Sequence, residues 1–399
     1  MSNLDSSTNQ PRLLSFTLDG WSVLGGRVTV SLHDGVAVLV GRNGSGKSAI
    51  IEGFEAISSF ALGKFNQVPQ NDINYIPKIL EIELLTPNNR WLKYIYELII
   101  ISPSDKGSEL NYSTIDKTEE NLFSWNDCCQ YADKQKEILW TTKNGETTII
   151  NDGISTSFVS TSLFGRFRIT GTKSPKLHEE ILWIRAALQG INILNNSLVR
   201  RGTRREKELL NVTQKTFPLK YNDLPRAILR QILILRETEN FDELKSVCQR
   251  IGLGKITELK SFQEEGEYFF SVKLDGVDIG LLSDGTLRVL SILTEIIASN
   301  QGKTIIIEEP EAQIHPAMLA KLLNEIETYT YGQNLIISTH SPQVVAWASP
   351  EKINLVHRKD GQTFVRKLAE DDIHSIIEYL SDAGIVGEWI FRGILDDSH

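Results

Sequence analysis

The sequence predicts an α/β fold whose parallel sheet is built from two distant parts of the chain, with an antiparallel β subdomain and an inserted α-helical lobe between them. Three observations predict this fold. An unbroken apolar run at Val36–Val40 leads directly into a glycine-rich loop and a helical pattern, the order of a buried strand, a turn and a helix. Helix-like and strand-like segments alternate over residues 287–339, as in a parallel sheet. The residues in between have first strand-like and then helix-like patterns.

The composition indicates a globular protein without a strong charge bias. The chain has 399 residues, 41% hydrophobic and 23% charged, so it can bury a large core in one or two domains. A net charge of −9 gives no general attraction for a polyanion, so nucleic-acid binding would need a local basic patch. Three cysteines without a Cys-x-x-Cys spacing argue for a reducing compartment, against a disulfide framework and against a zinc site. With no signal-peptide pattern and no apolar run near the about 20 residues that span a bilayer, we expect a cytoplasmic protein without membrane contact.

The first part of the chain is predicted to be a polar, disordered tail over residues 1–11, followed by strands within residues 12–172. From residue 79 to residue 153 the pattern predicts a β subdomain with hairpins around Thr86–Asn89 and Asn144-Gly145, whose turn residues tolerate positive φ. The strands predicted before this subdomain are Leu13–Leu18, Arg27–Ser31 and Val36–Val40.

Residues 173–256 are predicted to form the helical lobe. Ser174-Pro175 suits the start of a first helix, because serine caps helices and proline fits their first turn. The apolar residues of this helix recur three or four positions apart and are Leu177, Ile181, Ile184, Leu188 and Ile191. Two more helices are expected at Pro225–Arg236 and Phe241–Ile251, the latter ended by Gly252.

Residues 257–399 are predicted to complete the parallel sheet. A strand at Tyr268–Leu274 turns at Asp275-Gly276 and leads to a second glycine-bearing motif, Leu282–Thr286. Helices and strands then alternate at Leu287–Ala298, Thr304–Ile307, Met318–Thr328 and Leu335–Thr339. A hairpin at Asp360-Gly361 and a short helical tail are expected after them.

The glycine-rich loop has the pattern Gly-x-x-x-x-Gly-Lys-Ser. Its glycines let successive backbone N–H groups point inward and cradle phosphate oxygens. Lys47 then places a positive charge at the β and γ phosphates of a nucleotide, and Ser48 offers its hydroxyl to Mg²⁺. The alternative is a coincidental glycine turn, which the strand before the loop and the helix after it disfavour. The predicted nucleotide-binding residues of this loop are Gly41, Arg42, Asn43, Gly44, Ser45, Gly46, Lys47 and Ser48.

Two adjacent glutamates, Glu308 and Glu309, follow three isoleucines at the end of a predicted central strand. Adjacent carboxylates repel each other unless a cation or a proton transfer uses them, and ligands of open α/β sheets lie beyond the carboxyl ends of the strands. We therefore expect Glu308 to bind Mg²⁺ and Glu309 to act as general base on the attacking water, the alternative being a solvated strand end. His340 follows the next apolar strand and is expected to contact the γ phosphate, whereas His315 suits a structural role and a subunit contact equally.

Four motifs, in this order, resemble those of ABC-type ATPases of the RecF and overcoming-lysogenization-defect (OLD) branch, which includes SMC-like AAA proteins. Asn43–Ser48 resembles the Walker A motif and Ser283–Arg288 the signature motif. Ile307–Pro316 is similar to the Walker B motif and the D-loop, and Ser338–Pro342 to the segment that carries the switch histidine. The resemblance implies an ABC-type P-loop ATPase head that uses ATP and Mg²⁺.

The resemblance also implies that ATP is held between two subunits of a homodimer or a higher homo-oligomer. Ser283 and Gly285 of one subunit would complete the nucleotide-binding site of another, which would couple ATP binding to association. The sequence departs from the commonest ABC pattern, because Ser-Asp-Gly-Thr replaces Ser-Gly-Gly-Gln and Glu308 replaces an aspartate, which changes the expected magnesium geometry. Gln67 and Gln70 are the candidates for the glutamine loop.

The first candidate function is a sensor ATPase of prokaryotic anti-phage defence that controls a separate effector protein, expected to be a nuclease. OLD-type nucleases carry a metal-binding toprim domain after the ATPase. Only 59 residues (341–399) follow His340, too few for such a domain, so DNA cleavage would come from a partner protein.

The second candidate function is DNA repair, as in RecF. DNA would contact a basic cluster, which Glu206 and Glu208 dilute. The cluster consists of Arg200, Arg201, Arg204, Arg205 and Lys207. A nucleotide-binding subunit of a transporter is a third candidate, disfavoured by the Ser-Asp-Gly-Thr signature, and a scaffold that binds ATP without hydrolysis is a fourth.

Overall fold

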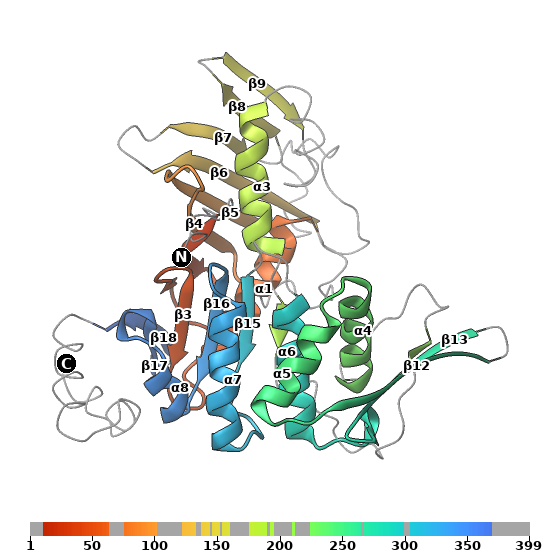
Figure 1. Cartoon of the computed structure of the whole chain (residues 1–399). Helices are drawn as coiled ribbons and strands as arrows, with labels where there is room; N and C mark the ends of the chain where they lie inside the picture. The colour runs from red at the N-terminus through yellow and green to blue at the C-terminus, as the bar shows by residue number, and fades with distance from the viewer. Residues whose placement is uncertain are drawn as a thin grey trace, which may run out of the picture.

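The computed structural model describes residues 11–63, 76–101, 122–132, 137–143, 146–151, 154–159, 175–189, 192–194, 210–211, 224–264, 267–298 and 304–368. These residues form two large sheets, a small third sheet and the helices that cover them (Figure 1), and the predicted α/β fold class is confirmed. The predicted tail up to residue 10, the turn at Asn144-Gly145 and the helical tail after residue 368 lie outside the described residues. None of the described helices is long and apolar enough to cross a membrane.

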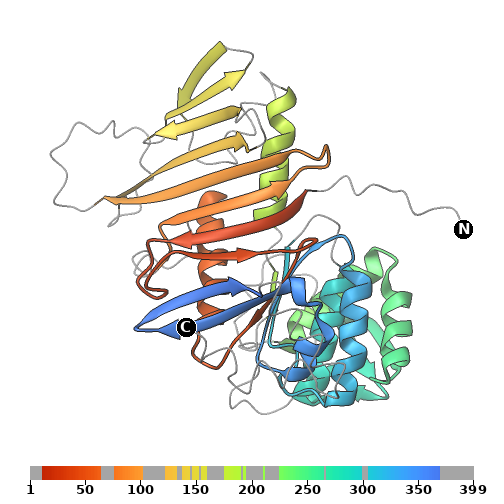
Figure 2. The ribbon, with the colours of Figure 1, turned by 90° about the vertical axis from the view of Figure 1, so that its left-hand side faces the viewer.

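The larger sheet is antiparallel and eight-stranded (Figure 2). In spatial order its strands are β2 (Val28–Ser31), β1 (Arg12–Asp19), β4 (Ile79–Leu85), β5 (Trp91–Ile101), β6 (Leu122–Tyr131), β7 (Ile138–Lys143), β8 (Glu146–Asn151) and β9 (Ile154–Val159). Side chains along β4 alternate between buried and partly exposed, which is the pattern of a sheet with one face on a core. Because β1 pairs with β4 along its whole length, the first strands of the chain and the predicted β subdomain form one continuous sheet.

The second sheet carries the predicted parallel strands. In spatial order it contains β10 (Asn192–Leu194), β15 (Thr304–Glu308), β16 (Asn334–Thr339), β3 (Val36–Val40), β17 (Ile353–Lys359) and β18 (Gln362–Lys367). All neighbours are parallel except the β17–β18 hairpin, which turns at Asp360-Gly361 as predicted. Every residue of β15 and β16 is buried, which explains the apolar runs Ile305–Ile307 and Leu335–Ile337 at their centres.

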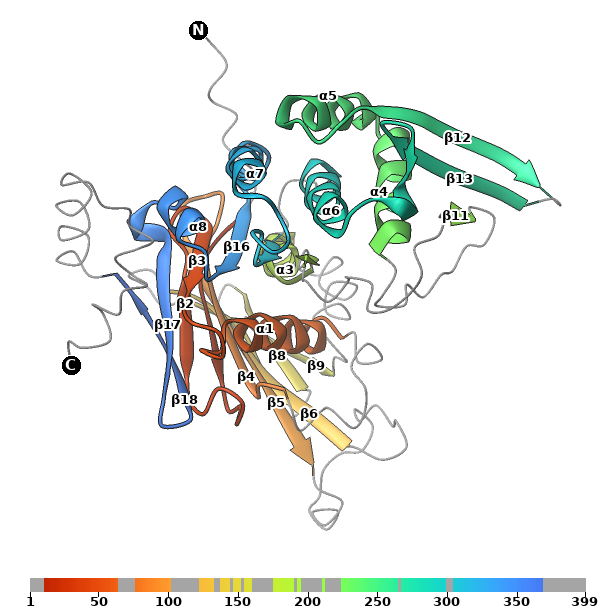
Figure 3. The ribbon, with the colours of Figure 1, turned by 90° about the horizontal axis from the view of Figure 1, so that it is seen from below.

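Helix α1 (Lys47–Ala61) begins with the last two residues of the glycine-rich loop and lies between the two large sheets (Figure 3). Its buried face includes Phe54, whose ring stacks on Phe16 of β1 with centroids 4.1 Å apart. The same hydrophobic core includes Ile306 of β15 and Ile336 of β16. Helices α6 (Asp284–Ala298), α7 (Pro316–Tyr329) and α8 (Pro342–Trp347) contribute to a second core on the other face of the parallel sheet. The packing of α1 against both sheets fixes the position of the loop that precedes it.

The structure contains all three helices that were predicted for the lobe. They do not pack together as one unit, because they belong to two different hydrophobic cores. They are α3 (Pro175–Gln189), α4 (Leu224–Glu237) and α5 (Phe241–Ile251). Ile181 and Ile184 of α3 belong to the core around α1, whereas α4 and α5 pack in the core that contains α6. α5 ends at Gly252, whose φ of 81° suits a residue without a side chain. The boundary of the lobe at 173–256 stays a proposal.

The third sheet includes a long hairpin that extends away from the rest of the chain (Figure 1). Its strands are β11 (Leu210–Asn211), β12 (Ile256–Glu264), β13 (Glu267–Leu274) and β14 (Val277–Asp278). The sequence did not predict β12. Its pairing with β13 shifts register between Ile256 and Glu258, and this irregularity breaks the two-residue period that marks a strand.

Candidate nucleotide-binding site

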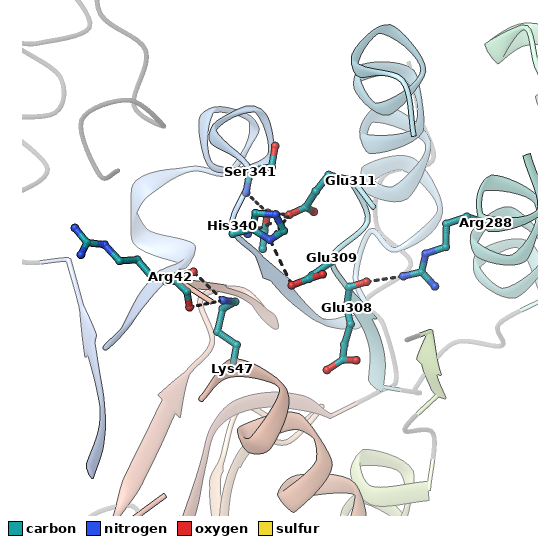
Figure 4. A network of polar contacts seen from close by, with 10 residues as sticks. Arg42, Lys47, Arg288, Glu308, Glu309, Glu311, His340 and Ser341 are labelled. Carbon is teal, nitrogen blue, oxygen red and sulfur yellow. Dashed lines mark hydrogen bonds and ion pairs between the residues drawn. The ribbon is translucent and has the colours of Figure 1, made fainter. Parts of the chain in front are cut away.

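Three parallel strands bring the predicted site residues to one edge of the sheet. β3 ends at the glycine-rich loop, β15 at Glu308 and β16 immediately before His340. The register pairs Glu308 with Ser338, and Thr339 with Val40, so the three strand ends are neighbours. Figure 4 shows the side chains that converge at this edge. These residues therefore lie at the carboxyl ends of adjacent parallel strands.

The glycine-rich loop packs against the β17–β18 hairpin. A Cβ atom at Gly41 would lie 2.2 Å from the carbonyl oxygen of Val356, and one at Gly46 would lie 2.5 Å from Oγ1 of Thr363. Gly46 also has a φ of 108°, which a side chain would strain. In contrast, a Cβ at Gly44 would meet no atom within 4 Å. The loop is thus held closely on its hairpin side and is open at Gly44.

Lys47 is the first residue of α1, and its side chain is almost fully buried. Its Nζ donates hydrogen bonds to the carbonyl oxygens of Gly41, at 2.7 Å, and Arg42, at 3.1 Å. Burial lowers the pKa of Lys47, and the nearby carboxylates of the Glu308–Glu311 segment oppose this change. The ammonium group therefore lies across the loop and faces an acidic cluster.

Glu308 and Ser48 meet at the start of α1. The Glu308 carboxylate accepts a hydrogen bond from the Ser48 hydroxyl, and burial raises the pKa of Glu308 more strongly than this bond lowers it. Glu308 is only 9% exposed, and its Oε1 has no hydrogen-bond partner. A hydroxyl beside a carboxylate is an oxygen donor set that suits Mg²⁺. No group of three or more His, Cys, Asp or Glu among the described residues could hold a metal, so such an ion would need ligands from elsewhere, such as a phosphate.

Glu309 leaves the strand with a left-handed backbone. Its φ is 45°, and its N–H donates to the carbonyl oxygen of Ser338 at 2.8 Å. This conformation is uncommon for a residue with a side chain, and it often marks functional sites. The carboxylate approaches the imidazole of His340, with Oε1 3.3 Å from Nδ1. The two predicted catalytic residues are therefore neighbours.

Residues 184–346 match the model of a family described as "AAA domain, putative AbiEii toxin, Type IV TA system". This range contains the signature motif, both adjacent glutamates and His340. This part of the chain therefore matches an AAA domain. The glycine-rich loop at Gly41–Ser48 lies before the matched range, and the parallel sheet joins the two.

Three solved structures of SMC heads are similar to this chain. The SmcHead bound to the C-winged helix domain of ScpA has 14% identity and a TM-score of 0.48, with 91% of this chain and 99% of that chain covered. The Smc head domain with an extended coiled coil, bound to the C-terminal domain of ScpA and derived from Pyrococcus furiosus, has 13% identity and a TM-score of 0.45, with 93% and 100% covered. The SMC head domain from Thermotoga maritima has 13% identity and a TM-score of 0.36, with 90% and 99% covered. No curated protein matches the sequence.

The predicted signature motif lies at the start of α6. Oγ of Ser283 accepts a hydrogen bond from the Thr286 N–H at 3.2 Å and lies 2.8 Å from Thr286 Oγ1, so Ser283 caps the helix. A Cβ at Gly285 would lie 2.3 Å from the carbonyl oxygen of Gln313. Ser283 is exposed, and within the described part of the chain its hydrogen bonds stay in the first turn of α6. The structure does not join Ser283 to the glycine-rich loop of its own chain by a hydrogen bond.

Sequence reasoning missed Arg288, which connects α6 to the end of β15. Its side chain is 2% exposed and donates a hydrogen bond to the carbonyl oxygen of Glu308 (Figure 4). Burial lowers the pKa of Arg288 to about 10, and the charges of Glu308, Glu311 and Glu309 oppose this change. An arginine among the apolar residues of α6 is the only sign of this contact in the sequence.

Sequence reasoning also assigned no role to Glu311, which contacts both Thr339 and His340. His315 caps α7, because its Nδ1 accepts a hydrogen bond from the Ala317 N–H, whereas a subunit contact of His315 stays untested. The remaining candidates lie outside the described residues and are Gln67, Gln70, Arg200, Arg201, Arg204, Arg205 and Lys207.

Proposed function

We propose that this chain binds ATP with Mg²⁺ and hydrolyses it between two copies of itself. The convergence of three strand ends on one edge of the parallel sheet carries this proposal, because it brings together every element that the chemistry needs. The residues concerned are Lys47, Ser48, Glu308, Glu309 and His340.

The glycine-rich loop suits the phosphates of ATP. The open space at Gly44 and the backbone N–H groups at the start of α1 form an anion-binding cradle. Lys47 now bonds to two loop carbonyls and can exchange these partners for β- and γ-phosphate oxygens. Ser48 and Glu308 would hold Mg²⁺, which neutralises phosphate charge when bound.

Glu309 and His340 suit the hydrolytic step. Glu309 would accept a proton from the attacking water, as a general base within reach of the γ phosphate. His340 contacts the carboxylate of Glu309 through Nδ1, which leaves Nε2 for the phosphate. This pair would couple proton transfer to the presence of the γ phosphate.

Ser283 and Gly285 would complete the site of a second copy of the chain. Their support is the exposed position of Ser283 just before α6, where Ser283 makes no hydrogen bond to its own glycine-rich loop. Backbone N–H groups at a helix N-terminus favour phosphate oxygens. ATP binding would then drive association, and hydrolysis would release it.

The ATPase is proposed to act as a sensor in prokaryotic anti-phage defence, where it controls a separate nuclease. The description of the matched family as a putative toxin of a Type IV TA system supports a role in such a multi-component system. The alternative is DNA repair of the RecF kind, which predicts salt-dependent DNA binding through the basic cluster around Arg200–Arg205. A transporter subunit is less well supported because of the Ser-Asp-Gly-Thr signature.

Phosphate release and light scattering with and without ATP test the ATPase proposal. The wild type should release phosphate. Glu309→Gln should release none and should form an ATP-dependent dimer, because it binds ATP but lacks the base. Glu327→Gln, on the exposed face of α7, is the matched control and should behave like the wild type. Hydrolysis that persists in Glu309→Gln would exclude Glu309 as the base, and no hydrolysis by the wild type would favour an ATP-binding scaffold.

A further inference from the structure

Glu311 joins the segment after β15 to the end of β16. Its Oε1 accepts hydrogen bonds from Thr339 Oγ1, at 2.7 Å, and from the backbone N–H of His340, at 3.0 Å. Thr339 Oγ1 in turn accepts a hydrogen bond from the Ser341 N–H at 2.9 Å. One carboxylate oxygen therefore fixes the turn that carries His340.

The Glu311 side chain is nearly buried. It is 10% exposed, compared with 29% for Glu309, and its Oε2 has no hydrogen-bond partner. Burial of a carboxylate is unfavourable unless the group is fully hydrogen-bonded. A glutamate at this position therefore indicates that the negative charge is needed beside His340, which a neutral acceptor such as glutamine would not supply.

The imidazole of His340 lies between two carboxylates. Its Nδ1 is 3.3 Å from Glu309 Oε1 and 3.5 Å from Glu311 Oε1 (Figure 4). The Glu311 carboxylate accepts two hydrogen bonds, whereas the Glu309 side chain is more exposed. Glu311 can thus hold the ring while Glu309 turns toward a water molecule.

We propose that Glu311 is a positioning residue, which fixes the backbone and the ring of His340 so that Glu309 stays available for proton transfer. This inference rests on the proposed hydrolysis of ATP. It assigns no contact between Glu311 and the nucleotide. Loss of Glu311 should consequently lower kcat and leave ATP affinity nearly unchanged.

The test combines Glu311→Gln, Glu311→Ala and His340→Ala in a double-mutant cycle. Gln keeps an acceptor for Thr339 and removes the charge, whereas Ala removes both, so kcat should fall about 3–10-fold and about 10–100-fold respectively, with ATP affinity within about 3-fold. In the His340→Ala background, Glu311→Ala should lower kcat less than 3-fold further, because residues that act as a unit are not additive. Glu327→Gln again serves as the control.

A second measurement does not depend on activity. Histidine labelled with ¹⁵N gives ring signals by NMR, and His340→Gln identifies that of His340. Glu311→Gln should shift this signal in the folded protein without ATP. Full additivity in the cycle, or an unchanged ring signal, would overturn the inference, whereas a wild type that releases no phosphate would overturn the proposed function and leave the ring signal to decide the inference.

Discussion

Gly285→Ala tests the packing of the signature motif against the segment that follows β15. The added Cβ would lie 2.3 Å from the carbonyl oxygen of Gln313, whereas ordinary contacts begin at 3.4 Å. The two backbones must therefore separate by about 1.1 Å, the difference between these two distances. Neither atom belongs to a flexible side chain, so rotamer changes cannot relieve the contact.

Two effects of opposite sign act on the stability of this variant. Alanine is favoured over glycine in a helix by about 1 kcal/mol, and less in the first turn. Overpacking costs about 1–3 kcal/mol. The overpacking should outweigh the gain in helix propensity, so the free energy of unfolding should fall by about 1–2 kcal/mol and Tm by about 1–2 °C.

Thermal unfolding followed by circular dichroism measures this balance. A second variant, Gln313→Gly, tests the same contact from the other side. Gln313 has a φ of 63°, which glycine adopts without strain, so the segment after β15 can move away from Gly285 more easily. The double variant should recover part of the lost Tm relative to the sum of the single changes. A Tm of Gly285→Ala equal to or above that of the wild type would refute the close contact, because helix propensity alone predicts that result.

Three further predictions follow from the buried charges. Lys47→Ala should weaken ATP binding at least about 30-fold, about 2 kcal/mol, because a charge-assisted contact is lost, and calorimetry showing wild-type affinity would contradict the site. Arg288→Met should lower the free energy of unfolding, measured in urea, by about 3 kcal/mol. The carbonyl oxygen of Glu308 loses its buried donor, and the carboxylates of Glu308, Glu309 and Glu311 lose a nearby cation. An unchanged urea midpoint would contradict this prediction. Burial raises the pKa of Glu180 in the folded protein above its value in the unfolded chain. The contribution of Glu180 to the free energy of unfolding is therefore complete below the pKa of the unfolded chain, and it is lost as pH rises through the pKa of the folded protein. Glu180→Gln keeps an acceptor for Tyr131 and cannot ionise, so its Tm should exceed that of the wild type at pH 8 and equal it at pH 4, whereas an equal gap at both pH values would contradict the assignment.

The parallel sheet and the glycine-rich loop could be predicted because their signals are local. The strands Val36–Val40 and Thr304–Glu308 are almost entirely buried, so they contain the apolar runs Val36–Val40 and Ile305–Ile307. The order of strand, loop and helix then fixes where Lys47 and Ser48 lie. The end of each run marks the sheet edge at which Glu309 and His340 meet.

The remaining features depend on contacts between distant residues. The contacts of Glu311 with Thr339 and of Arg288 with Glu308 arise only when β15, β16 and α6 pack together. The register shift in β12 hides a strand, and the apolar face of α3 does not reveal which of two cores it joins. Local periodicity cannot supply this information.

Hydrolysis by a mixture of two inactive variants tests the central claim, that each ATP site is shared between two copies of the chain. Ser283→Arg blocks the signature motif and Lys47→Ala blocks the glycine-rich loop, so each variant alone should be inactive. In an equal mixture, half of the dimers are mixed and each of these has one intact site, so about one quarter of the wild-type rate should return. No recovery in the mixture, with an active wild type and mixed dimers present, would contradict a shared site.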